Sequence, residues 1–156
     1  GYGDNYHLNN SHVLPALIRK FSDAIKNNKK KVEIWGDGSP IREFMFVDDL
    51  AESVYTILGI SKVKYDRILK KNKISFLNVG TSKEISIKNL AYLIKKITKF
   101  RGKIFFNTKY PNGNPYKVLS CRISHKIWKP KVDLKNGIKK TYDDYINNFI
   151  KLRKWV

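Results

Sequence analysis

The stretch of residues 35–49, WGDGSPIREFMFVDD, constrains the fold more than any other part of the chain. A short apolar run at residues 32–35 precedes a cluster of glycine, aspartate, serine and proline, and a second run with strand character follows at residues 41–47. This order predicts two strands joined by a tight turn. The acidic pair Asp48 and Asp49 then predicts the start of a helix.

Such a hairpin places Trp35 and Arg42 near one another. A flat aromatic face beside a permanently charged guanidinium fork suits a ligand that combines a ring with a phosphate. The alternative is a structural hairpin in which Trp35 is buried and Arg42 is an ordinary surface cation.

The remaining sequence alternates helix-like and strand-like segments. Helices are expected at residues 12–27 with Ser11 as N-cap, at 48–58, at 87–98 with Ser86 as N-cap and at 134–153, and strands at 76–79 and 103–106. Residues 61–73 read as a long mobile basic loop, 110–115 as a turn, and 120–127 as a short helix or turn. This alternation predicts an α/β fold with a small mixed sheet.

The charge balance points to an anionic partner. The 156 residues include 32 basic and 13 acidic side chains, for a net charge of +19. Nucleic acid, an anionic membrane and a phosphorylated small molecule all satisfy that charge. Most of the basic residues are lysine, which weakens base-specific DNA reading, because that task relies on arginine.

Several features exclude other classes of protein. The single cysteine, Cys121, cannot form an internal disulfide, and no apolar stretch is long enough to span a membrane, so we expect a soluble cytoplasmic protein. Paired cysteine and histidine sets of the metal-binding kind are lacking, so no metal is expected. The glycine-rich dinucleotide fingerprint is also missing from this sequence.

Three blocks carry a family resemblance. Residues 4–21 (DNYHLNNSHVLPALIRKF), 33–51 (EIWGDGSPIREFMFVDDLA) and 76–91 (FLNVGTSKEISIKNLA) resemble the C-terminal half of GDP-L-fucose synthases, which are extended short-chain dehydrogenases/reductases that remodel nucleotide sugars. The resemblance implies a small mixed α/β substrate-binding domain over residues 1–156, together with the last strand and helix elements of a Rossmann-type sheet. The N-terminal part of that sheet would precede Gly1, where no initiator methionine stands.

The resemblance also implies a cofactor and a reaction. NADP(H) would be held mainly by the preceding half, which carries the family's Ser/Tyr/Lys catalytic set, so this chain alone is expected to lack reductase activity. The full enzyme would be a homodimer that converts a GDP-4-keto-6-deoxy-hexose or a related heptose. Tyr92 and Lys96 have the Y-x-x-x-K spacing of short-chain reductases, but they lie far from the place where the family carries that pair.

Individual positions match functional residues of the family. His12 matches a histidine that faces the reacting sugar and the nicotinamide end of the cofactor, and that acts as an acid in epimerisation. Lys20 matches a basic substrate contact where arginine is common, so the charge is kept without the bidentate fork. Trp35 and Arg42 match residues that contact the GDP-sugar, with Arg42 reaching its pyrophosphate.

The turn after residue 110 departs from the family pattern. Asn112 stands where an aspartate is usual, and Tyr116 replaces the first residue of a basic pair, of which Lys117 survives. Asn112 and Lys117 are still expected to contact substrate. The departure leaves open whether the sugar is a hexose or a heptose, and whether the enzyme epimerises as well as reduces it.

Two alternatives remain at this stage. One is a nucleotide-sugar epimerase or dehydratase of the same superfamily with another substrate. The other is a nucleic-acid-binding module, which the net charge of +19 and the nine tyrosines favour.

Overall fold

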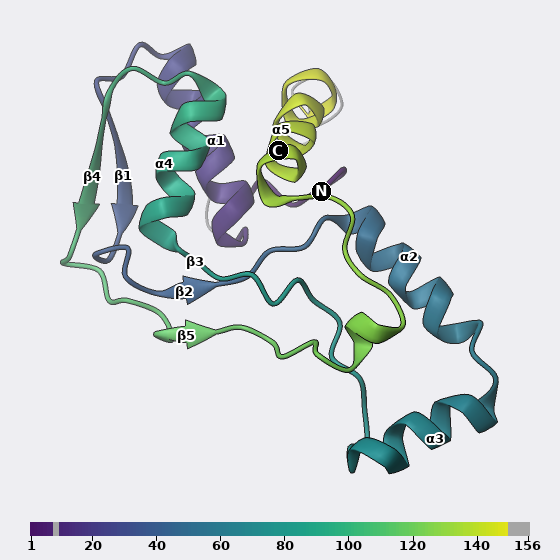
Figure 1. The fold of residues 1–156 in the computed structure, drawn as a ribbon. Coiled ribbons are helices and arrows are strands. Elements are labelled where there is room, and N and C mark those ends of the chain that lie inside the picture. The colour runs from purple at the N-terminus through teal and green to yellow at the C-terminus, as the bar shows by residue number, and fades with distance from the viewer. Residues whose placement is uncertain (8–9, 150–156) are drawn as a thin grey trace.

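Two parallel strands and two helices form the centre of the molecule, shown in Figure 1. The computed structural model describes residues 1–7 and 10–149. Strand β1 (Lys31–Trp35) pairs in parallel with β4 (Lys103–Asn107), and helices α1 (Val13–Lys26) and α4 (Ile87–Thr98) pack beside them. The predicted α/β class is confirmed.

A second sheet, made of three very short strands, lies next to this centre. Its strand order is β3-β2-β5, with β2 (Ile41–Arg42) antiparallel to β3 (Ile85–Ser86) and parallel to β5 (Tyr116–Lys117). The predicted hairpin is therefore wrong, because β1 and β2 belong to different sheets. Gly36 and Gly38, with φ angles of 77° and 79°, redirect the chain between them.

The core is built from the helical stripes of α1 and α4. Leu17, Ile18 and Phe21 of α1 are buried together with Leu90 and Ile94 of α4. The apolar spacing of α1 predicts a buried stripe of Val13, Leu17, Phe21, Ala24 and Ile25, and Leu17, Phe21 and Ala24 are buried as predicted. Ile25 is exposed instead, and Ile18, which lies outside the predicted stripe, is fully buried.

The predicted N-cap is correct for helix α4 and wrong for helices α1 and α2. Helix α4 has the predicted bounds, and the Ser86 side chain accepts a hydrogen bond from the Asn89 amide at 3.1 Å, which confirms its role as N-cap. Helix α1 begins one residue late, with His12 rather than Ser11 at the N-cap. Helix α2 (Val47–Leu58) begins after Phe46, so neither Asp48 nor Asp49 caps it.

Two predictions between residues 61 and 79 are wrong. The expected loop contains helix α3 (Lys62–Asn72), whose N-cap Ser61 accepts from the Lys64 amide and whose first turns carry a Lys62–Asp66 ion pair. Residues 76–79 form no strand, since no neighbouring strand pairs with them. Both segments lie at one end of the molecule, where α2 and α3 extend away from the α1/α4 centre in Figure 1.

The C-terminal region packs on the start of the chain. A 3-10 turn at Ser124–Lys126 falls inside the predicted 120–127 segment, and helix α5 (Leu134–Asp144) continues as a π-helical turn at Tyr145–Phe149. The predicted closing helix began at the right residue, and its last part, from residue 150, lies outside the described residues.

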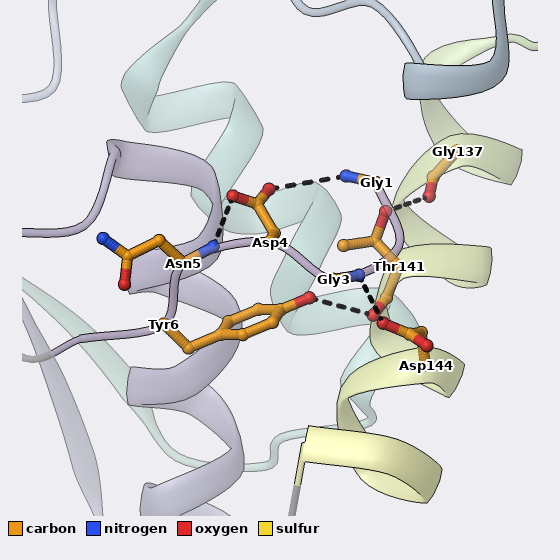
Figure 2. Close-up of polar contacts among 8 residues, drawn as sticks. All are labelled: Gly1, Gly3, Asp4, Asn5, Tyr6, Gly137, Thr141 and Asp144. Carbon is orange, nitrogen blue, oxygen red and sulfur yellow. Dashed lines mark hydrogen bonds and ion pairs between the residues drawn. The ribbon is translucent and has the colours of Figure 1, made fainter. Parts of the chain in front are cut away.

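Figure 2 shows how the first residues are fastened to α5. The Tyr6 hydroxyl donates a hydrogen bond to the carbonyl of Thr141 at 3.3 Å, and the Gly3 amide donates to Asp144 at 3.1 Å. Burial raises the pKa of Tyr6 well above its usual value, with Asp4 and Asp144 adding to the effect. The neutral phenol is thus a fixed part of the fold, and it holds the segment that leads into α1.

Asp49 joins α2 to the segment before α5. Its carboxylate is buried and accepts hydrogen bonds from the backbone amides of Lys131 and Val132, at 3.1 and 2.9 Å. Glu52, one turn later, pairs with the Lys131 side chain. An acidic residue inside the first turn of a helix is favourable in itself, and here it also satisfies two backbone donors.

We predict that Asp49→Ala lowers the free energy of unfolding by about 2–3 kcal/mol, because two backbone donors lose a charged acceptor. The neighbouring Asp48→Ala is the matched control: Asp48 is exposed in the same helical turn and should cost about 0.5 kcal/mol. Urea unfolding of both variants measures the difference. Equal costs for the two would contradict the role given to Asp49.

Candidate functional site

A cavity of about 340 Å³ lies where helix α1, the turn after β1, strand β2 and the loop at residues 111–113 meet. Lys20, Trp35, Arg42 and Asn112 all line it. These side chains come from four separate segments of the chain, and the parallel β1/β4 pairing and the β2/β5 pairing bring the segments together. Four of the six predicted site residues thus surround one cavity.

Lys20 supplies a half-buried positive charge on one wall. Its Nζ donates a hydrogen bond to the backbone carbonyl of Glu33 at 3.1 Å and lies 5.1 Å from the centre of the Trp35 ring. Burial lowers the pKa of Lys20, and the nearby Glu33 opposes that effect. An anion bound in the cavity would replace the lost solvation of this ammonium group.

Arg42 supplies the second cation. Its Nη1 donates to the carbonyl of Ile41 at 2.7 Å, and its Nη2 lies 3.4 Å from the position that a Cβ on Gly113 would take. The loop at Gly113 thus lies close to the guanidinium group. Within the described part of the chain, no carboxylate forms an ion pair with either Arg42 or Lys20. Two cations around one cavity without a carboxylate partner favour a phosphorylated ligand.

Trp35 supplies an aromatic surface. It is the last residue of β1, and 59% of its side chain is exposed, so the alternative of a buried tryptophan is wrong. The ring stacks on Tyr110, with 4.6 Å between centroids and 16° between planes. Sequence reasoning missed Tyr110, whose position follows from the register of β1 with β4 rather than from any local motif.

Asn112 fastens the loop that closes the cavity. Its Oδ1 accepts a hydrogen bond from the Asp37 amide at 3.0 Å. Hydrogen bonds from Ser39 and then from Asn112 lower the pKa of Asp37. A Cβ at Gly36 would collide with the Asn112 side chain, so that glycine is needed both for its φ of 77° and for space.

His12 and Lys117 lie beside the cavity rather than in its wall. The exposed His12 is the N-cap of α1, and its two neighbours Ser11 and Val13 line the cavity. The exposed Lys117 on β5 stands opposite Arg42 in the parallel register. Tyr92 and Lys96 lie on α4, and neither lines this cavity.

Among residues 1–7 and 10–149, no group of histidine, cysteine, aspartate and glutamate side chains could hold a metal ion. None of the helices in that part of the chain is long and apolar enough to cross a membrane.

Comparison with known proteins finds consistent similarities in sequence and in fold. The NAD dependent epimerase/dehydratase family matches residues 1–69. A probable GDP-L-fucose synthase 1 of Oryza sativa subsp. japonica is 42% identical over 155 residues, which cover 99% of this chain and 44% of that protein. The chain therefore spans less than half the length of this relative.

Solved structures agree with the sequence match. A GDP-6-OMe-4-keto-L-xylo-heptose reductase from C. jejuni is 32% identical, with a TM-score of 0.79 over 94% of this chain and 51% of that one. MlghC, a GDP-mannoheptose C4 reductase from Campylobacter jejuni with NADP bound, is 37% identical, with a TM-score of 0.72 over 88% of this chain and 46% of that one.

In sequence and in fold, the chain is thus similar to enzymes of the NAD dependent epimerase/dehydratase family. Within that class, the chain is homologous to the GDP-L-fucose synthases over nearly its whole length. The comparisons do not favour a nucleic-acid-binding module.

The lowered pKa of Lys20 predicts a proton linkage. A diphosphate beside the ammonium group favours its charged form, so GDP binding at alkaline pH should take up protons, and affinity should fall as pH rises. Calorimetry in buffers of different ionisation enthalpy measures the uptake. Lys20→Arg is the control, because arginine stays charged throughout and should remove the contribution of this residue. The same uptake in both proteins would contradict the prediction.

Proposed function

We propose that residues 1–156 are the GDP-sugar-binding portion of an NADP(H)-dependent 3,5-epimerase/4-reductase. Its substrate is a GDP-4-keto-6-deoxy-hexose or a related heptose, as in GDP-L-fucose synthesis. The observation that carries this proposal is the convergence of Lys20, Trp35, Arg42 and Asn112 on one cavity. The names of the relatives, which are GDP-sugar synthases and reductases, support the same substrate class.

Each side chain has a separate task in this proposal. Arg42, on strand β2, binds the pyrophosphate through its guanidinium fork, and Lys20 adds a second positive charge from helix α1. Trp35 stacks against the base. Asn112 keeps the loop closed and offers its amide to the ribose, and Lys117 adds a positive charge on the strand beside Arg42.

His12 is proposed as the acid of the epimerisation steps. Its neighbours Ser11 and Val13 place it at the edge of the cavity, where an imidazolium can donate a proton to the enolate carbon formed next to a ketone. The family resemblance also implies that this histidine faces the nicotinamide end of the cofactor. His12 therefore serves chemistry rather than anchoring.

The hydride donor is proposed to lie mainly on a preceding N-terminal half. This chain carries no glycine-rich fingerprint, whereas the related C. jejuni C4 reductase has NADP bound and is about twice as long. Leu50, Val54 and Leu58 of α2 expose an apolar face, with 79% of Leu58 exposed, and Phe76, which follows α3, is also exposed. Such a face fits against another part of the same enzyme. A cytoplasmic homodimer completes the proposal.

Arg42 gives the sharpest test of the binding role. In the full-length enzyme, Arg42→Ala should weaken GDP-sugar binding about ten- to a hundredfold, because a charge-assisted pair in a partly desolvated cavity contributes about 1.5–3 kcal/mol. NADPH affinity should stay unchanged. Arg101→Ala, which removes an exposed arginine elsewhere, is the control. Calorimetry with GDP-sugar measures both, and normal binding by Arg42→Ala would contradict the assignment.

His12→Ala should have a different effect. It should slow solvent deuterium incorporation at the epimerised carbons and leave GDP-sugar affinity within about threefold of wild type, because the imidazole transfers protons and does not hold the nucleotide. NMR of the recovered sugar measures the exchange. Exchange at the wild-type rate would exclude His12 as the acid.

A further inference from the structure

A stacked aromatic pair stands at the border of the cavity. Trp35 lines the cavity, and Tyr110, which stacks on it at 4.6 Å, does not. One face of the indole is thus occupied by the Tyr110 ring, at the border of the cavity that Trp35 lines. Both residues are partly exposed, at 59% for Trp35 and 42% for Tyr110. Within the described part of the chain, Trp35 is not among the residues of the packed core.

The loop that carries Tyr110 is fastened at both ends to the segment that carries Trp35. At one end, the Gly36 amide donates to the carbonyl of Asn107 at 3.0 Å, and the Tyr110 amide donates to the same carbonyl at 3.3 Å. At the other end, the Asn112 side chain accepts from the Asp37 amide. These bonds hold the two residues that follow Trp35 against residues on either side of Tyr110.

The cavity side of the indole is suited to a flat base joined to phosphates. Lys20 Nζ lies 5.1 Å from the ring centre, and Arg42 lines the same cavity. Because Lys20 Nζ lies over the ring, a base that stacks on Trp35 would move this flexible side chain aside, and its phosphates would lie toward the two cations. A sugar phosphate without a base would use the cations and leave the indole unused.

We propose that Tyr110 is a positioning residue, which holds the plane of Trp35 in the orientation that receives the base of a nucleoside diphosphate. This inference rests on the proposed function and adds a residue to it. An exposed tryptophan at a strand end can occupy several rotamers, and ordering it on binding costs conformational entropy. The Tyr110 ring removes that cost before the ligand arrives, which raises affinity by preorganisation.

The test compares two substitutions in the full-length protein. Tyr110→Ala removes the stacking ring, and Tyr110→Phe keeps it without the hydroxyl. Calorimetry with GDP and with inorganic pyrophosphate separates the base from the phosphates. Steady-state kinetics with the GDP-sugar separates KM from kcat. Tyr92→Ala, an exposed tyrosine on α4, is the control, and Trp35→Ala reports the full loss of stacking.

We expect Tyr110→Ala to lower the affinity for GDP about three- to tenfold, which corresponds to the loss of an aromatic pair. The affinity for pyrophosphate should change by less than about twofold. KM should rise with kcat nearly unchanged, and Tyr110→Phe should restore wild-type values. If Tyr110→Ala binds GDP with wild-type affinity while Trp35→Ala binds it weakly, the inference about Tyr110 is overturned and the proposed function is not. Equal weakening of GDP and pyrophosphate would also overturn it, because the effect would then be on the loop and not on the base. Failure of the wild-type protein to bind GDP would overturn the proposed function as well.

Discussion

The parallel pairing of β1 with β4 determines the geometry on which the rest of the site depends. The register sets Trp35 opposite Asn107, so the two strands end side by side. The turn after β1 and the loop after β4 then leave from the same edge and fasten to each other through Gly36, Asp37 and Asn112. Without this pairing, the indole, the stacking tyrosine and the closing loop would belong to unrelated parts of the surface.

Two positive charges in the cavity, Lys20 and Arg42, have no carboxylate ion-pair partner within the described residues. Lys20 is half-buried with a carbonyl and a ring face as partners, and Arg42 bonds to the carbonyl of its own neighbour. Burial of the charged Lys20 ammonium group without a carboxylate ion-pair partner costs stability. A bound pyrophosphate would offset that cost, since it brings negative charge to both. Functional cavities commonly carry a destabilising arrangement of this kind.

The sequence predicted those features that local chemistry decides. Helix α4 and its Ser86 cap follow from apolar spacing and a capping serine, and the turn at Gly36 and Gly38 follows from glycines that adopt positive φ. Local sequence patterns do not predict which distant strands pair. The hairpin prediction for β1 and β2 is wrong for this reason, and no sequence prediction covers Tyr110. Helix α3 was missed because it buries no side chain, and the amphipathic signal of such a helix is weak. The convergence of Lys20, Trp35, Arg42 and Asn112 was expected from family resemblance, and composition or periodicity alone would not have given it.

A crystal structure of the full-length protein with GDP would show whether this cavity binds the nucleotide of a GDP-sugar. We expect a pyrophosphate within hydrogen-bonding distance of both Lys20 and Arg42, with the base stacked on one face of Trp35 and Tyr110 still on the other. GDP bound at full occupancy elsewhere on the protein, away from these four side chains, would rule out this cavity as the nucleotide site.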